Sequence, residues 1–115
     1  KADIIKTAKK INSKIAFAVC SEQYHNLNVI MSQAADELLE GKGIEASYVM
    51  GKDESGQILI SARSLGEINV QLSMEKLGGG GHLTMAGAQL DMSLEEAEKK
   101  LMEVINEILE EGGKE

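Results

Sequence analysis

Apolar positions along the chain alternate between the spacing of helices and the unbroken runs that are typical of buried strands. Residues 3–12 and 26–41 carry apolar side chains three and four positions apart, which predicts two amphipathic helices. Between them, residues 14–20 form a continuous apolar run, "KIAFAVC", which predicts a strand covered on both faces. Gly41 offers an end for the second helix.

The second half of the chain also alternates between predicted strands and helices, and its turns are easier to locate. It predicts strands at residues 44–51 and 57–64, a short helix at 69–77, a strand at 84–90 and a last helix ending near 111. The polar segment "KDESG" at 52–56 predicts a turn that joins the first two of these strands as a hairpin. Asn69 is interpreted as the cap of the short helix, and Ser93 with Glu96 forms a capping box before the last helix.

This order of elements predicts an α/β fold, in which a mixed β-sheet of about four to five strands is flanked by helices. The first strand–helix–strand unit should be a right-handed parallel crossover, whereas the hairpin requires an antiparallel pair. With 115 residues, the chain is long enough for one modest core, so residues 1–115 are expected to form a single domain. Because it begins at Lys1, directly in a predicted helix, we expect it to be a piece of a longer polypeptide.

Charge narrows the classes of function that this domain can serve. The formal net charge is −7, which argues against a surface that coats nucleic acid, because such surfaces need clustered lysine and arginine. A local anion site is not excluded, and Arg63 is the single arginine among twelve basic residues. The single cysteine, Cys20, cannot form an internal disulfide, which suits a reducing compartment. No apolar run approaches the length of a membrane span.

Four consecutive glycines, residues 78–81, stand between a predicted helix and a predicted strand. Glycines can adopt positive φ and let backbone N–H groups converge, and such concavities bind anions, phosphate above all. A flexible connector is the alternative, although a connector would more naturally mix glycine with other polar residues. His82 follows at once and could donate a hydrogen bond to a bound phosphate. The sequence therefore predicts an anion site at this loop.

Arg63 stands near the end of a predicted strand in the segment "SARS". Side chains two positions apart share one face of a strand, so Ser61 and Arg63 should point the same way. A guanidinium beside a hydroxyl suits phosphate oxygens, with a bidentate geometry that lysine cannot offer. The alternative interpretation is an ordinary surface arginine at a strand end.

The sequence does not supply a catalytic set. A phosphoester hydrolase needs a water activated by a metal ion, or a nucleophile with a base. His25 and His82 are the two histidines, and neither has a cysteine or carboxylate nearby at the spacing of metal ligands. We therefore expect no catalytic residue, no metal site and no bound cofactor in this chain, which should be inactive alone.

Taken together, the motifs "SARS", "NV", "LGGGGH" and "AG" between residues 61 and 87 resemble the DHH-associated C-terminal domain of the DHH phosphoesterase superfamily. The segment 61–90 looks most like the cyclic-di-AMP phosphodiesterases of Gram-positive bacteria. The resemblance implies a preceding DHH domain, absent here, whose Asp and His residues hold two manganese ions that activate water. It also implies a site on the cytoplasmic face of a membrane-anchored protein, with no direct membrane contact by this domain.

Carried over onto this chain, the resemblance implies that it forms the substrate-binding wall of the cleft. Serine and arginine side chains would hold the phosphate or ribose of a nucleotide or cyclic dinucleotide. Glycine backbone would approach the nucleotide, and the histidine would contact the phosphate. The residues implied are Ser61, Arg63, Ser64, Gly79, Gly80, Gly81 and His82.

A second function is left open from a different class of protein. Related domains in alanyl-tRNA synthetases contact tRNA, and those in RecJ-type nucleases help to hold single-stranded DNA, so the domain could be a nucleic-acid-binding appendage. The acidic net charge and the three aromatic residues argue against that role, because little is present to neutralise a backbone or stack bases. Homodimerisation through apolar helices is also left open, although it would leave "GGGGH" unexplained.

Overall fold

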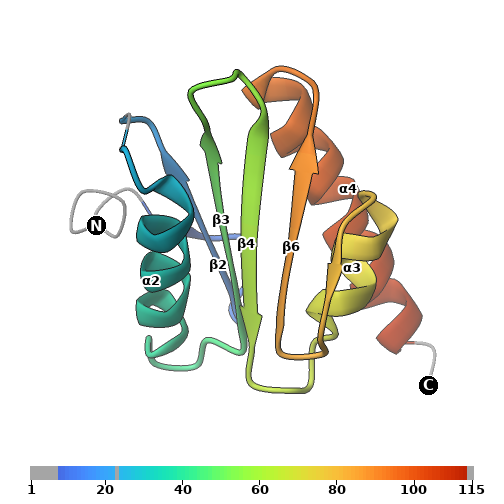
Figure 1. Ribbon diagram of the computed structural model, residues 1–115. Coiled ribbons are helices and arrows are strands. Elements are labelled where there is room, and N and C mark those ends of the chain that lie inside the picture. Colours follow the sequence, from blue (N-terminus) through green and yellow to red (C-terminus); the bar gives the residue numbers. More distant parts are fainter. Residues whose placement is uncertain (1–7, 23, 114–115) are drawn as a thin grey trace.

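The computed structural model describes residues 8–22 and 24–113, which form a single sheet with helices on both faces (Figure 1). The sheet has six strands in the order β1-β2-β3-β4-β6-β5. In chain order the elements are β1 (Lys9–Lys10), β2 (Ile15–Cys20), α2 (Leu27–Leu39), β3 (Ala46–Lys52), β4 (Ile58–Ser64), α3 (Val70–Lys76), β5 (Gly80–Gly81), β6 (Met85–Leu90) and α4 (Leu94–Gly113).

The predicted α/β class and mixed sheet are confirmed, with a strand count slightly above the four to five expected. Strands β2 and β3 are parallel and are connected through α2, while β3 and β4 form the predicted antiparallel hairpin. The additional strands, β1 and β5, are two residues long each. Such short strands form only by pairing with a longer neighbour, so hydrophobic periodicity in the sequence does not predict them.

The helix predicted at residues 3–12 is wrong where the structure can be compared with it. Residues 3–7 lie outside the described part, but Lys9 and Lys10 form β1, which pairs antiparallel with Phe17 and Ala16 of β2. The side chain of Asn12 accepts hydrogen bonds from the backbone N–H groups of Lys14 and Ile15 at 2.7 and 3.0 Å. This tight turn reverses the chain, and pairing with β2 overrides the local helical pattern.

The helices divide between the two faces of the sheet, as Figure 1 shows for α2 on one side and α3 with α4 on the other. Alternate residues of β2 and β3 supply both cores: Ala16, Ala18 and Val49 pack under α2, whereas Phe17 and Tyr48 pack under α3 and α4. Burial on both faces explains why β2 is a continuous apolar run. Cys20 is buried in the α2 core, as a small hydrophobic side chain.

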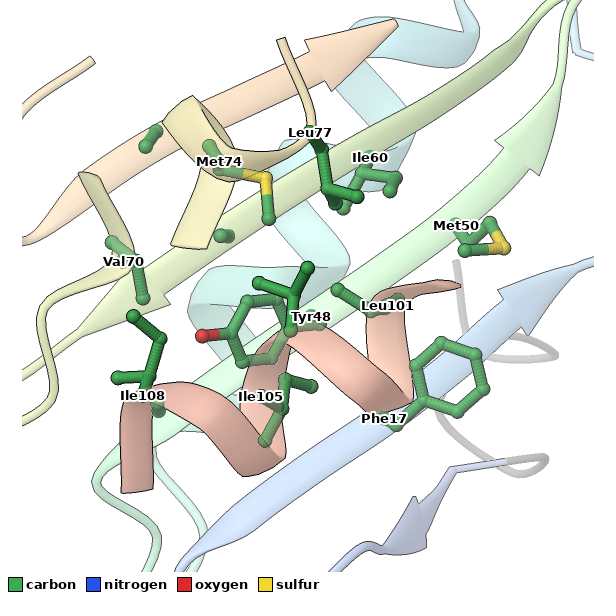
Figure 2. Packing of buried hydrophobic residues seen from close by; sticks show 14 of the residues in the cluster. Phe17, Tyr48, Met50, Ile60, Val70, Met74, Leu77, Leu101, Ile105 and Ile108 are labelled. Atoms are coloured by element: carbon green, nitrogen blue, oxygen red, sulfur yellow. The ribbon is translucent and has the colours of Figure 1, made fainter. Parts of the chain in front are cut away.

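Tyr48 lies at the centre of the larger core, beneath Leu101 and Ile105 of α4 (Figure 2). Its ring is fully buried, and its hydroxyl is 3.1 Å from the hydroxyl of Ser73 on α3. Ser73 in turn donates to the carbonyl oxygen of Val70 at 2.9 Å. The buried polar atoms are thus paired with one another, which removes the cost of leaving them unsatisfied.

The predicted helix caps are present. The side chain of Asn69 accepts from the backbone N–H of Leu72 at 3.0 Å and caps α3. The hydroxyl of Ser93 accepts from the backbone N–H of Glu96 at 3.1 Å, which is the N-cap bond of a capping box, and donates to the Glu96 carboxylate at 3.0 Å. Across residues 8–22 and 24–113, every helix is too short or too polar to cross a bilayer.

Candidate phosphate-binding site

A cavity of about 720 Å³ lies beside α2, over strands β4 and β6. Its walls come from α2, from β4 and β6, and from the loop between α3 and β5, which approach one another from distant parts of the sequence. The residues that line it are Asn28, Ser32, Gln57, Leu59, Ile60, Ser61, Arg63, Gly78, Gly79, Ala86, Gly87, Ala88 and Gln89. Arg63 and the first half of the glycine run therefore border the same space.

Arg63 is held in place by two hydrogen bonds. Its Nε donates to Oδ1 of Asp36 on α2 at 2.9 Å, and its Nη1 donates to the carbonyl oxygen of Ala62 at 2.9 Å. The Arg63 side chain is 11% exposed, whereas that of Asp36 is 61% exposed. A guanidinium has five N–H donors, and these two bonds leave three for a ligand. The cation is thus fixed in orientation but retains donors that an anion could use.

The two serines that flank Arg63 have different surroundings. Ser61 lines the cavity and shares the face of Arg63, as the strand alternation predicts. Ser64 is buried away from the cavity lining. Its hydroxyl donates to the carbonyl oxygen of Ile68 at 2.6 Å and accepts from the N–H of Gly66 at 2.9 Å. The structure thus brings Ser61 to the cavity and gives Ser64 a role in the turn after β4.

The first two glycines of the run are explained by local geometry. Gly78 has φ of +87° and follows the end of α3, and the N–H groups of Gly78 and Gly79 donate back to the carbonyls of Glu75 and Met74 at 3.0 and 2.8 Å. These two bonds form a Schellman motif, which favours glycine at the position of positive φ. A Cβ on Gly79 would lie 2.1 Å from the carbonyl oxygen of Gly87. Both positions therefore require glycine even before a ligand is considered.

The second half of the run lies outside the cavity lining. Gly81 has φ of +146°, and a Cβ there would lie 2.5 Å from Cα of Ala86. Gly80 differs, because a Cβ there would meet nothing within 4 Å. His82 is exposed at the turn between β5 and β6, where its N–H donates to the carbonyl oxygen of Met85 at 2.7 Å. Substrate binding by Gly80, Gly81 and His82 stays a prediction.

Several residues that line the cavity, and Asp36 beside Arg63, were not anticipated from the sequence. Asn28, Ser32 and Asp36 recur every four positions on α2, so they form one polar stripe of that helix facing β4. Gln57, which directly precedes β4, and Gln89 of β6 border the cavity at its other end. The four-residue spacing on α2 was a usable signal, but only the parallel run of α2 and β4 shows which strand the stripe faces.

Cys20 lies in the core under α2 and does not line the cavity. Burial raises the pKa of the Cys20 thiol, with smaller opposing contributions led by the hydrogen bond to the backbone of Glu22. A thiol protonated in this way is a poor nucleophile. In the described part of the chain, His, Cys, Asp and Glu side chains do not gather in threes or more at a place that could hold a metal ion. Manganese binding by a preceding DHH domain, which the resemblance implies, stays a prediction.

Comparison with curated proteins gives relatives of a consistent kind. The chain is 47% identical over 115 residues to the cyclic-di-AMP phosphodiesterase GdpP of Geobacillus thermodenitrificans. It is 44% identical over 104 residues to the cyclic-di-AMP phosphodiesterase PdeA of Listeria monocytogenes. These matches cover 99% and 90% of this chain but only 17% and 16% of the two relatives. The chain thus spans about a sixth of the length of either one.

Solved structures share the fold at lower sequence identity. An exopolyphosphatase-related protein from Bacteroides fragilis matches with a TM-score of 0.76 at 22% identity, over 92% of this chain and 33% of that protein. A pGpG-specific phosphodiesterase from Vibrio cholerae matches with a TM-score of 0.63 at 18% identity, over 92% and 36%. A family model described as the DHHA1 domain matches residues 12–111. The chain therefore belongs to the DHHA1 domain family, as the motifs between residues 61 and 87 had suggested.

Proposed function

We propose that this domain forms the phosphate-binding wall of a phosphodiesterase that acts on cyclic-di-AMP or on short oligonucleotides. The observation that carries the proposal is that Ser61, Arg63 and Gly79 border one cavity. The two relatives from Geobacillus and Listeria are cyclic-di-AMP phosphodiesterases, and their activity supplies the class of substrate. A phosphodiester carries negative charge, and Arg63 is the one charged side chain among the described residues that line this space.

The chemistry of the wall follows from its residues. The three remaining N–H donors of Arg63 can bind phosphate oxygens, and the hydroxyl of Ser61 lies on the same face of β4. Because the guanidinium is largely withdrawn from water, its attraction for an anion is screened less than that of a surface lysine. Gly87, opposite Ser61 in the ladder, leaves the floor of the cavity without a side chain.

The groups that break the phosphodiester are proposed to lie outside this chain. A water activated by metal ions needs a cluster of ligands, which the described residues do not provide. We therefore propose that a preceding DHH domain supplies manganese ligands and that this chain orients the substrate. By itself the chain is expected to bind nucleotides without hydrolysing them.

The test is a titration of the 15N-labelled chain with linear pApA, cyclic-di-AMP and inorganic phosphate, followed by NMR. Arg63 is the single arginine, so its Nε–H gives one side-chain signal that needs no resolution from others. All three ligands should shift this signal, because all carry phosphate. Arg63→Ala should abolish saturable binding. Lys100→Ala, which removes one exposed positive charge on α4, should leave it unchanged and serves as the charge-matched control.

Two results would overturn the proposal. One is an Arg63 Nε–H signal that stays in place at saturating ligand. The other is binding that strengthens steadily with oligonucleotide length and is equally weakened by Arg63→Ala and Lys100→Ala, since that is the behaviour of a nonspecific nucleic-acid appendage.

A further inference from the structure

A row of four side chains runs along the cavity and changes in chemistry from one end to the other. One face of β4, together with the residue that precedes this strand, carries the side chains of Gln57, Leu59, Ser61 and Arg63. All four line the cavity. At about 3.4 Å per residue, the row extends roughly 20 Å between its ends. This is far more than one phosphate group needs, so the end distant from Arg63 is available for another part of a ligand.

The distant end is built from carboxamides. Gln89 of β6 stands opposite Leu59 in the ladder, and its Nε2 donates to Oε1 of Gln57. Asn28 of α2 and Leu59 both line this cavity and an adjoining hollow of about 400 Å³, so Asn28 stands near the same end. The bond between the glutamines leaves Oε1 of Gln89 as an acceptor and N–H groups of both amides as donors.

We propose that this carboxamide end binds the nucleobase of the nucleotide whose phosphate is held at Arg63, with a preference for adenine. The inference rests on the proposed function of the same cavity. A neutral amide offers a donor and an acceptor side by side, which matches the N7 acceptor and N6 amino group of adenine. The apolar side chain of Leu59, one step along the row, provides a surface for the face of a base.

The distribution of charge also distinguishes the Arg63 end of the cavity from the carboxamide end. Phosphate needs a cation or charge-assisted donors, and the lining residues supply a cation only at Arg63. A base needs hydrogen bonds without a net charge, which glutamine and asparagine provide. A nucleotide laid along β4 therefore has one favoured direction, with its phosphate toward Arg63 and its base toward Gln57 and Gln89.

The experiment uses probes that carry only one half of a nucleotide. In the 15N-labelled chain, adenosine should shift the side-chain amide signals of Gln57 and Gln89, and uridine should shift them far less. Inorganic phosphate should instead shift the Nε–H signal of Arg63 and leave these amides in place. Failure of the phosphate arm refutes the proposed function, whereas failure of the adenosine arm alone refutes only the present inference.

Substitutions extend the test to intact nucleotides. Gln57→Ala with Gln89→Ala should weaken adenosine 5′-monophosphate roughly tenfold, the lower range of one bidentate base contact, and leave ribose 5-phosphate unchanged. Gln71→Ala on α3 is the matched control and should alter neither affinity. The inference is overturned if adenosine at saturation leaves both amides unshifted, if adenosine and uridine act alike, or if the double variant weakens both phosphates equally. The wild-type titration decides the question even if the double variant does not fold.

Discussion

Two neighbouring glycines, Gly79 and Gly80, differ so strongly in their surroundings that a single methyl group distinguishes them. A Cβ at position 79 would lie 2.1 Å from the carbonyl oxygen of Gly87 and 2.7 Å from Cα of Ala88. Both obstacles are backbone atoms, so no side chain can rotate away. At position 80 the same methyl group meets nothing within 4 Å, and φ there is not positive.

The magnitude follows from the size of the overlap. Restoring an ordinary contact requires the loop and β6 to separate by about 1 Å, which disturbs the pairing of β5 with β6. Overpacking of this kind costs about 1–3 kcal/mol, so Gly79→Ala should lower the free energy of unfolding by about 2–3 kcal/mol. Gly80→Ala should change it by about 0.5 kcal/mol or less.

Urea denaturation followed by circular dichroism measures both variants. With a slope of roughly 1.5 kcal/mol per molar urea for a domain of this size, the midpoint of Gly79→Ala should fall by about 1.3–2 M. The midpoint of Gly80→Ala should remain within about 0.3 M of the parent chain. Equal midpoints for the two variants would refute the close approach of this loop to β6, and with it the assignment of Gly79 to the cavity wall.

Three further predictions concern single contacts. Asp36→Ala removes the acceptor that fixes Nε of Arg63, and calorimetry should show pApA binding weakened roughly tenfold. Asp36→Asn, which keeps an acceptor oxygen, should cause a smaller loss. Unchanged or tighter binding by Asp36→Ala would contradict the positioning role of Asp36. Tyr48→Phe should cost about 0.5–1.5 kcal/mol at neutral pH through the lost contact with Ser73. Because burial raises the pKa of Tyr48 above 10.0, the stability of the parent chain should decline as the pH rises past 10, and the gap to Tyr48→Phe should narrow there; a gap that is constant with pH would be inconsistent with this. Ser93→Ala should lower the free energy of unfolding by about 1 kcal/mol, measured by thermal unfolding. An unchanged stability would show that the Ser93 cap does not stabilise α4.

The elements that the sequence predicted well are those with local causes. The periodicity of α2, the hairpin of β3 and β4, and the caps at Asn69 and Ser93 depend on residues within a few positions of one another. Strand β1 could not be predicted in this way, because its two residues are extended only through pairing with β2. Contact between distant segments decided its conformation.

In the candidate site, too, features with local causes could be predicted from the sequence, and features that depend on contacts between distant segments could not. Strand alternation alone placed Ser61 beside Arg63, and the glycine run pointed to an unusual backbone. The sequence could not reveal that Gly79 and Gly81 avoid clashes with β6, since that depends on how closely two strands approach. Asp36 was missed for a similar reason, because it lies 27 residues before its partner Arg63.

The way the sheet ends has a consequence for how copies of this domain can meet. In residues 8–22 and 24–113, the outermost strands are β1, which consists of two exposed lysines, and β5, which consists of two glycines. A long bare edge offers unpaired backbone N–H and C=O groups to another strand, and the short strands interrupt such an edge: β1 pairs with Phe17 and Ala16 of β2, and β5 pairs with Gly87 and Ala86 of β6. At the β5 side, pairing with a strand of another molecule is therefore interrupted at Ala86 and Gly87, which β5 already occupies, and it would have to use the rest of the length of β6.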